Sequence, residues 1–320
     1  MKIWLVGAGY WGSRIVDALK KFNVEPMIVD IKNDQSIEQT INTLDPVMLA
    51  TPVWEHFEQA KYLLERGHDL YIEKPMATTE QEVQQLSWLV NPGQIVMIGH
   101  LFIHHPQMQQ IKDMFAKAVV GELQHVSSRR MNWGIYQTKT DPLLSLAVHD
   151  LSIINHVARH PCNVVKCQAW VYSENEQPDR VQLSGETSHQ VTFDIDVSWH
   201  WPVRTRETVF IGTNGQIVWD QDANTISVHH KEIVNNRAVV KRDTEIYQYN
   251  SELSPLEHEI KHWLECLRDR SQPKTNIAQA LKIARAIDKA NALITIESPS
   301  WIKVDDLDSM FENMSQANPT

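Results

Sequence analysis

A chain of 320 residues, of which 42% are hydrophobic and 22% charged, is long enough for two domains that each bury a core. The net charge of −10 argues against nucleic acid or an anionic membrane as the main partner, and no apolar run approaches the ~20 residues of a membrane span. Three cysteines without a Cys-x-x-Cys pair suit a reducing compartment, so we expect a cytoplasmic protein whose N-terminus forms a strand rather than a signal peptide.

The N-terminal segment combines a strand, a glycine-rich turn and a helix. Lys2–Val6 is an apolar run typical of a buried parallel strand, and residues 13–20 have helical spacing. Between them lies Gly7-Ala8-Gly9-Tyr10-Trp11-Gly12, a G-x-G-x-x-G motif in the context that predicts dinucleotide binding. We expect Gly7 to permit the tight turn, Gly9 to admit a pyrophosphate, and Gly12 to let helix and strand pack closely. A plain strand–helix turn is the alternative.

A second strand, residues 26–29, ends in Asp30, which follows Gly12 by 18 residues. A carboxylate at this distance can accept hydrogen bonds from an adenosine ribose and would repel a 2′-phosphate. The position therefore favours NAD over NADP, although Lys32 keeps NADP open as the less favoured cofactor. The alternative is an Asp that caps a helix or is simply solvated.

Strands and helices continue to alternate up to residue 101, which predicts a doubly wound parallel sheet of the Rossmann type. Strands are expected over 47–50, 70–72 and 94–98, and helices over 36–44, 54–66 and 79–89. Because ligands bind at the carboxyl ends of such strands, the polar residues there are candidates for the site. They are Asp30, Thr51, Glu73, Lys74 and His100.

Residues 102–320 predict a second, α+β domain that would bind substrate and mediate oligomerisation. Its strands alternate apolar and polar residues, which is typical of a large, mostly antiparallel sheet with one face buried. Thr213-Asn214-Gly215 predicts a hairpin turn. Helices are expected over 105–118, 256–267 and 277–293, and the last two should return to the first domain. Apolar residues on both faces of the sheet indicate a homodimer or homotetramer.

In this order the motifs resemble the glucose–fructose oxidoreductase/inositol dehydrogenase (Gfo/Idh/MocA) family over nearly the whole chain. Within that family they are closest to the branch that oxidises nucleotide-linked sugars at the 3-position. The resemblance rests on the glycine motif, Ala50-Thr51-Pro52 with His56, Glu73-Lys74-Pro75, residues 99–106, residues 148–152, and the later segments 210–215 and 255–259.

The resemblance implies hydride transfer between a nicotinamide cofactor and a carbinol carbon of a sugar, nucleotide-sugar or cyclitol. Lys74 would hydrogen-bond the reacting hydroxyl, and His149 would accept its proton, a role that suits the pKa range of an imidazole. The alternatives are a surface lysine and a histidine of the core. The resemblance also places further residues around the cofactor: Tyr10, Trp11, Thr51, Pro52, His56 and Glu73.

The chain departs from the family pattern beside His149. Most relatives have an aspartate four residues before the histidine and many have one three residues after it, where this chain has Ser145 and Ser152. Asp150 directly follows the histidine. The missing carboxylate would orient His149 or hold a substrate hydroxyl. The alternative function is therefore a catalytically weak or inactive dinucleotide-binding sensor or assembly protein of the same fold.

Other polar clusters are weaker candidates. His100, His104 and His105 lack a Cys or acid at ligand spacing, so we expect no metal site. Substrate contacts are predicted for residues that should face the cleft from the second domain or lie beside the catalytic pair: His100, Arg129, Asn132, Tyr136, Ser145 and Asp150. We expect Trp199 and Trp201 to lie in the core or at an interface; a platform for a sugar ring is the second alternative.

Overall fold

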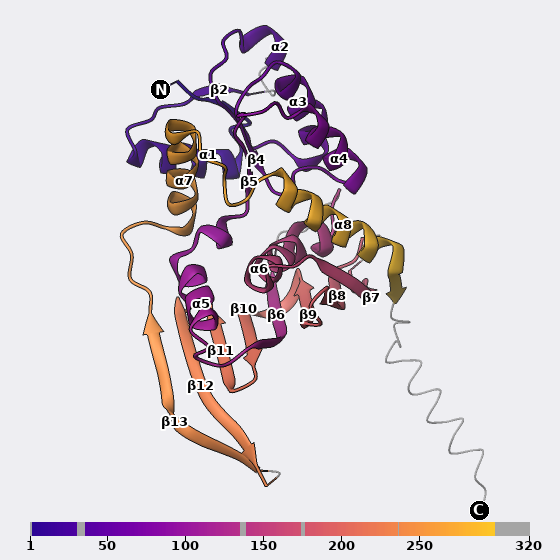
Figure 1. Ribbon diagram of the computed structural model, residues 1–320. Helices are drawn as coiled ribbons and strands as arrows, with labels where there is room; N and C mark the ends of the chain where they lie inside the picture. The colour runs from indigo at the N-terminus through magenta and orange to yellow at the C-terminus, as the bar shows by residue number, and fades with distance from the viewer. Residues whose placement is uncertain (1, 31–35, 135–138, 174–176, 236, 298–320) are drawn as a thin grey trace, which may run out of the picture.

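The computed structural model describes residues 2–30, 36–134, 139–173, 177–235 and 237–297. Two sheets lie one above the other, joined by the helices near the C-terminal end of the chain (Figure 1). No helix in these ranges is long and apolar enough to cross a membrane. All three cysteines are buried as free thiols.

The first sheet is parallel, with five strands in the order β2-β1-β3-β4-β5, which confirms the predicted doubly wound sheet. Its strands are β1 (Trp4–Val6), β2 (Met27–Val29), β3 (Val47–Leu49), β4 (Leu70–Glu73) and β5 (Val96–Gly99). Its helices are α1 (Tyr10–Lys21), α2 (Ile37–Thr40), α3 (Val53–Glu65) and α4 (Glu80–Leu89). Alternation along β4 fixes the two faces: Leu70 and Ile72 pack on the α3 and α4 side, and Tyr71 on the α1 side.

The helix predicted over residues 36–44 is mostly wrong, because only Ile37–Thr40 is helical. The Ser36 hydroxyl caps its start by accepting from the Gln39 N–H at 3.1 Å. The chain turns extended at Ile41, whose side chain is buried in the core, and β3 begins shortly afterwards. Burial of one apolar side chain thus ends the helix after a single turn.

The second sheet has nine strands in the order β13-β12-β11-β10-β6-β9-β8-β7-β14. It is mostly antiparallel as predicted, with parallel pairs between β6 and β9 and between β7 and β14. The hairpin predicted at residues 213–215 joins β10 to β11. The strands are β6 (Leu123–Trp133), β7 (Cys162–Trp170), β8 (Arg180–Thr187), β9 (Thr192–Ser198), β10 (His200–Gly212), β11 (Gly215–Asp220), β12 (Thr225–Val234), β13 (Arg237–Gln248) and β14 (Ile294–Glu297).

Helices cover one face of this sheet (Figure 1). They are α5 (Pro106–Ala116) and α6 (Val148–Ala158), and strand β8 shows the resulting alternation, with Val181 and Leu183 buried and Gln182 exposed. The other face carries bonded polar groups such as His125, whose Nε2 lies 2.7 Å from the Asp194 carboxylate. Association of copies through this face stays a prediction.

Two helices near the end of the chain tie the sheets together. Helix α7 (Pro255–Asp269) packs on α1, with an ion pair of 2.8 Å between Lys21 and Glu257. Helix α8 (Ile277–Leu293) runs between α4 and α6 (Figure 1), where the Asp288 carboxylate accepts the Glu80 N–H at 2.8 Å. The carboxyl ends of the first sheet are thereby held against α6 of the second.

Candidate active site

The glycine turn leaves open space where a pyrophosphate would lie. Gly7 has φ +92°, and a Cβ added there would lie 2.8 Å from the Ala50 carbonyl oxygen; one at Gly12 would lie 2.0 Å from the Gly7 carbonyl oxygen. At Gly9, by contrast, no described atom lies within 4 Å of an added Cβ. Gly9 begins α1 without a side-chain cap, so the first N–H groups of the helix are left for a ligand. These residues fit a bound dinucleotide.

Three further predicted cofactor residues lie around this turn. Asp30 follows the end of β2, next to the turn, because the Gly7 N–H donates to the Val29 carbonyl at 2.9 Å. Tyr10 is 75% exposed, and its hydroxyl accepts from Arg14 at 2.6 Å. Trp11 is half-buried and packs on the core between α1 and α7. Lys32 lies outside the described residues.

Thr51, Pro52 and His56 form a brace between β3 and the segment after β4. The ring nitrogens of His56 lie 2.8 Å from the Thr51 carbonyl oxygen and 2.9 Å from the Pro75 carbonyl oxygen. The Thr51 hydroxyl donates to Gln59 at 2.7 Å, and Pro52 precedes the first residue of α3. Burial lowers the pKa of His56, whereas its contacts with the two carbonyl oxygens raise it, and the ring braces the two segments. The contact of its ring with the Pro75 carbonyl oxygen holds the Lys74-Pro75 segment in place.

Glu73 is buried in the protein interior. The Tyr71 hydroxyl donates to the Glu73 carboxylate at 2.8 Å and lies 3.0 Å from the Glu259 carboxyl group of α7. Burial, reinforced by the charge of Glu73, raises the pKa of Glu259 well above its usual range. Since one phenol hydrogen cannot serve two acceptors, the protonated Glu259 donates to the Tyr71 oxygen. A Cβ at Gly99 would lie 2.6 Å from that oxygen, so only glycine fits there.

Lys74 stands at the end of β4 and reaches across to the second domain. Its ammonium donates to the main-chain carbonyl of Ser145 at 2.9 Å. Burial lowers the pKa of Lys74 to about 8; the nearby Glu73 carboxylate raises it, and Arg130 lowers it further. The lysine therefore carries a proton at neutral pH and can lose it under mildly alkaline conditions.

His149 lies in the first turn of α6, which directly continues the π-helical segment Leu143–Ala147 that contains Ser145, and the charge of Lys74 acts on its ring. The structure thus brings Lys74 and His149 to one place. The His149 ring meets the edge of Phe102 at 5.1 Å, and its Nδ1 has no hydrogen-bond partner in the described part of the chain. Burial, followed by the charge of Lys74, holds the pKa of His149 well below its usual range. These effects favour the neutral form of the ring and make it a weaker base than a free imidazole.

The polar residues around His149 hold the helix. The Ser145 hydroxyl donates to the Asp141 carbonyl at 2.8 Å, and the Ser152 hydroxyl to the His149 carbonyl at 2.6 Å. Asp150 is completely buried, and its carboxylate accepts from Arg130 Nε at 3.0 Å, from Arg130 Nη2 at 2.9 Å and from Ser128 at 2.8 Å. The predicted substrate contact of Asp150 does not fit this placement, because no part of the side chain is accessible.

The arginine that approaches the site is Arg130, not the predicted Arg129. Successive side chains of a strand point to opposite faces, and Arg130 binds Asp150 of α6 whereas Arg129 is exposed on the open face of the sheet. The Arg130 guanidinium also lies 4.5 Å from the centre of the Phe102 ring. Asn132, two residues after Arg130, lies on the same face of β6 and is half-buried near the end of the strand. Tyr136 lies outside the described residues.

His100, His104 and His105, the three histidines near the domain crossover, do not form a set of metal ligands in the described part of the chain. His104 lies 3.3 Å from the Thr275 hydroxyl, and His105 Nδ1 accepts the Gln107 N–H at 3.2 Å. Among the residues the structure describes, no group of three His, Cys, Asp or Glu side chains could hold a metal ion. His100 is 2% exposed, with its Nδ1 unbonded within the described ranges.

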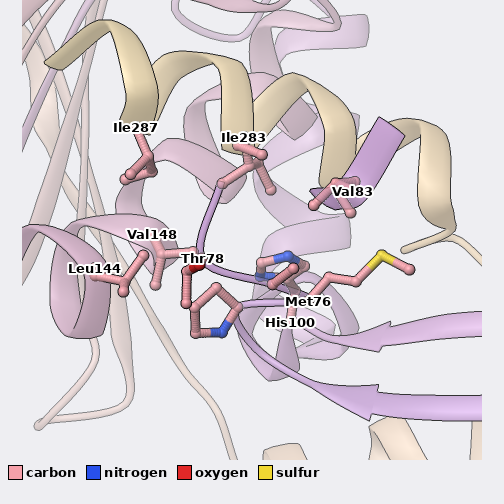
Figure 2. Close-up of a pocket in the computed structure, with 12 residues that line it drawn as sticks. Met76, Thr78, Val83, His100, Leu144, Val148, Ile283 and Ile287 are labelled. Carbon is pink, nitrogen blue, oxygen red and sulfur yellow. The ribbon is translucent and has the colours of Figure 1, made fainter. Parts of the chain in front are cut away.

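A small pocket lies behind the Lys74-Pro75 segment. Figure 2 shows its walls, with Ile283 and Ile287 of α8 above. Leu144, just before α6, and Val148, the first residue of α6, lie at the side. His100 and Thr78 are its only polar side chains. A sugar needs several hydrogen-bonding partners, so this apolar pocket supports the lysine segment and does not suit a sugar.

Comparisons with known proteins agree with this geometry. Residues 12–100 match a family model described as an oxidoreductase family with an NAD-binding Rossmann fold, and residues 108–218 match the Gfo/Idh/MocA C-terminal domain. The 4-carboxy-2-hydroxymuconate-6-semialdehyde dehydrogenase of Sphingobium sp. (strain NBRC 103272 / SYK-6) is 22% identical over 320 residues, covering 90% of this chain and 96% of the relative.

Solved structures share the fold over nearly its whole length. A UDP-N-acetylglucosamine 3-dehydrogenase from Acidithiobacillus ferrooxidans has a TM-score of 0.76 at 16% identity, covering 92% of this chain and 97% of its own. A 3-ketoreductase from Actinomadura kijaniata, in complex with TDP-benzene and NADP, has a TM-score of 0.77 at 15% identity (93% and 99%). A levoglucosan dehydrogenase, in complex with NADH and levoglucosan, has a TM-score of 0.78 at 13% identity (91% and 96%).

Proposed function

Because the chain belongs to the Gfo/Idh/MocA oxidoreductase family, we propose that it transfers a hydride between a nicotinamide cofactor and a carbinol carbon of a sugar, nucleotide-sugar or cyclitol. The observation that carries the proposal is the meeting of a protonated Lys74 and a neutral His149 at the carboxyl end of β4. The dehydrogenases and the reductase among the similar proteins, whose names include a nucleotide sugar and an anhydrosugar, support the substrate class.

Each member of the pair has a distinct task in this proposal. A nicotinamide cofactor held at the glycine turn would supply the acceptor for the hydride of the carbinol carbon. As the carbinol is oxidised its oxygen must lose a proton, and the neutral imidazole of His149 accepts it. The Lys74 ammonium donates a hydrogen bond to the same oxygen and stabilises the negative charge that develops there. The buried Glu73–Tyr71–Glu259 network fixes the strand end from which Lys74 projects.

A panel of sugars, cyclitols and nucleotide-sugars, assayed by the absorbance of the reduced nicotinamide, tests the proposal. Turnover on at least one class, lost in a His149 variant, would support it. Normal dinucleotide binding with no turnover on any member would instead favour the sensor or assembly function. The two outcomes are distinguishable because the glycine turn and the Lys74–His149 pair lie on different elements.

We expect NAD to bind more tightly than NADP by about 10- to 100-fold, the worth of a hydrogen bond to a charged group. Asp30, next to the glycine turn, would accept from the adenosine ribose of NAD and repel the 2′-phosphate of NADP. Titration of both cofactors into the wild type and into Asp30→Ala measures the preference. The variant should bind the two cofactors with similar affinity; an NADP preference in the wild type would overturn the assignment.

The pH dependence of kcat/KM for oxidation should have an alkaline limb near the Lys74 pKa of about 8. Below that pH the lysine is protonated and can donate; above it the ammonium is lost, so kcat/KM should fall about tenfold per pH unit. His149, whose pKa lies well below its usual range, adds no acidic limb near neutral pH. Lys74→Arg, which stays protonated, should remove the alkaline limb. A rate that rises through pH 8 would show that Lys74 acts instead as the base.

A further inference from the structure

We propose that Arg206 binds an anionic group of the substrate, a carboxylate or a phosphate, beside the Lys74–His149 pair. The proposal deepens the proposed function, on which it rests for the identity of the site, and it adds a charge requirement to the substrate. Three observations carry it: the face of the sheet on which Arg206 lies, the lack of a partner for its guanidinium among the described residues, and the charge of the groups around it.

The pairing of β10 with β6 places Arg206 on the face that looks toward α6. In this pairing Arg206 lies opposite Arg130, and Thr208 lies opposite Ser128. The hydroxyl oxygens of Ser128 and Thr208 are 3.1 Å apart, and Ser128 and Arg130 both bind Asp150 of α6. Because side chains two apart on a strand share a face, Arg206 points to the same side as Thr208. Consistent with this placement, its charge contributes to lowering the pKa of His149.

The carboxylates near Arg206 are already engaged. The oxygens of Asp150 are occupied by Arg130 and Ser128, as described above. Asp222 accepts from Arg204 Nε at 2.9 Å. Within the described residues the guanidinium of Arg206 therefore forms neither a hydrogen bond nor an ion pair, although it is partly buried. A partly buried cation without a counter-ion is unfavourable unless a ligand supplies the opposite charge.

The charges of the groups around Arg206 also favour an anionic ligand. Lys74 and Arg206 bring positive charge toward His149, whereas the charge of Arg130 is offset by its pairing with Asp150. This local excess of positive charge occurs in a chain whose net charge is −10. A guanidinium offers a planar fork of donors that matches a carboxylate or a phosphate. The pyrophosphate of the dinucleotide is not the expected anion, because the glycine turn belongs to the first sheet and Arg206 to the second.

Calorimetric titration of the NAD-saturated protein with inorganic phosphate and with acetate tests the anion site directly. Saturation with NAD keeps the glycine turn occupied. The variants are Arg206→Met and Arg206→Lys, with Arg204→Met as the matched control, since Arg204 lies two residues away on the same strand and is already paired with Asp222. We expect Arg206→Met to bind the anions about 10- to 100-fold more weakly than the wild type and the control, with Arg206→Lys in between.

Two results of this titration would overturn the proposal. One is an Arg206→Met variant that binds both anions as tightly as the wild type. The other is a wild type that binds neither anion once NAD is present. A circular dichroism spectrum and melting temperature like those of the wild type would show that the variant is folded, so that weakened binding reports the lost guanidinium.

Kinetics on a matched substrate series identifies the source of the anion. The series comprises a neutral sugar, its uronic acid, its sugar phosphate and its nucleotide-sugar. Arg206→Met should raise KM by about 10- to 100-fold for the members whose anion it binds, and should raise KM for the neutral sugar much less. A response to the uronic acid alone indicates a carboxylate, and a response to the phosphorylated members indicates a phosphate. Equal effects on all members would contradict the proposal. Anion binding without turnover would instead contradict only the proposed function.

Discussion

Replacing Lys74 by methionine should lower turnover by about 10²- to 10⁴-fold and leave the affinity for the dinucleotide nearly unchanged. The ammonium reaches the Ser145 carbonyl at the domain junction, whereas the pyrophosphate is expected at the glycine turn of β1 and α1. The variant therefore loses a donor to the reacting oxygen and keeps the cofactor site. Initial rates with a responsive substrate, together with NAD titration, measure the two effects separately. Lys61→Met, on the exposed surface of α3, is the control for loss of a lysine.

His149→Ala should cause a loss of similar size, because the proton of the carbinol would have no acceptor beside it. Ser145→Asp is the informative companion. If the carboxylate found in most relatives merely orients the histidine, restoring it should raise turnover; if Ser145 is adapted to one substrate, restoring it should lower turnover on that substrate. Weak NAD binding in Lys74→Met would contradict the assigned role, because the lysine would then belong to the dinucleotide site.

Replacing Asp150 by alanine should lower the free energy of unfolding by about 3–5 kcal/mol, the effect of removing one partner of a buried ion pair. Arg130 and Asp150 are 3% and 0% exposed at their side chains, so the variant would leave an uncompensated guanidinium in the core. The pair also joins β6 to α6, which carries His149, so activity should fall with stability. Urea unfolding followed by circular dichroism measures the change.

Two further variants separate the buried pair from ordinary surface charges. Asp222→Ala removes the partner of Arg204, which is 59% exposed, and should cost at most about 1 kcal/mol. The double variant Arg130→Met with Asp150→Leu removes both buried charges and should recover most of the lost stability. An Asp150→Ala protein as stable as the wild type would show that Arg130 finds another partner or reaches water.

The first sheet and half of the site follow from local sequence patterns. Each parallel strand is a short apolar run, and each run ends at a polar residue or a turn, so the strand ends that carry Asp30, Thr51 and Lys74 can be located without knowing the fold. The glycine motif is equally local, because the turn, the helix start and the close contact of Gly12 with Gly7 all lie within one strand–helix unit.

The other half of the site depends on which strands pair and which faces meet. The sequence alone pointed to Arg129, because the face on which a strand residue lies is open until the partners of the strand are known. Only pairing of β6 with β10 and packing of α6 on that face decide that Arg130 meets Asp150 and that Arg206 lies beside it. Edge strand β14 likewise depends on tertiary structure, since it is defined by its parallel partner β7.

Local propensity and periodicity thus determined where this chain forms its Rossmann strands, its glycine turn and the strand end that bears Lys74, whereas only the family resemblance points to His149. The tertiary structure decided what those residues face: the Ser145 carbonyl in place of a carboxylate for Lys74, a buried arginine for Asp150, and no described partner for Arg206. The physical reason is that the spacing of apolar residues, which predicts a helix or a strand, is a property of a few neighbouring residues. Charge pairing and pKa depend on groups far apart in the sequence, which only burial and strand register bring together.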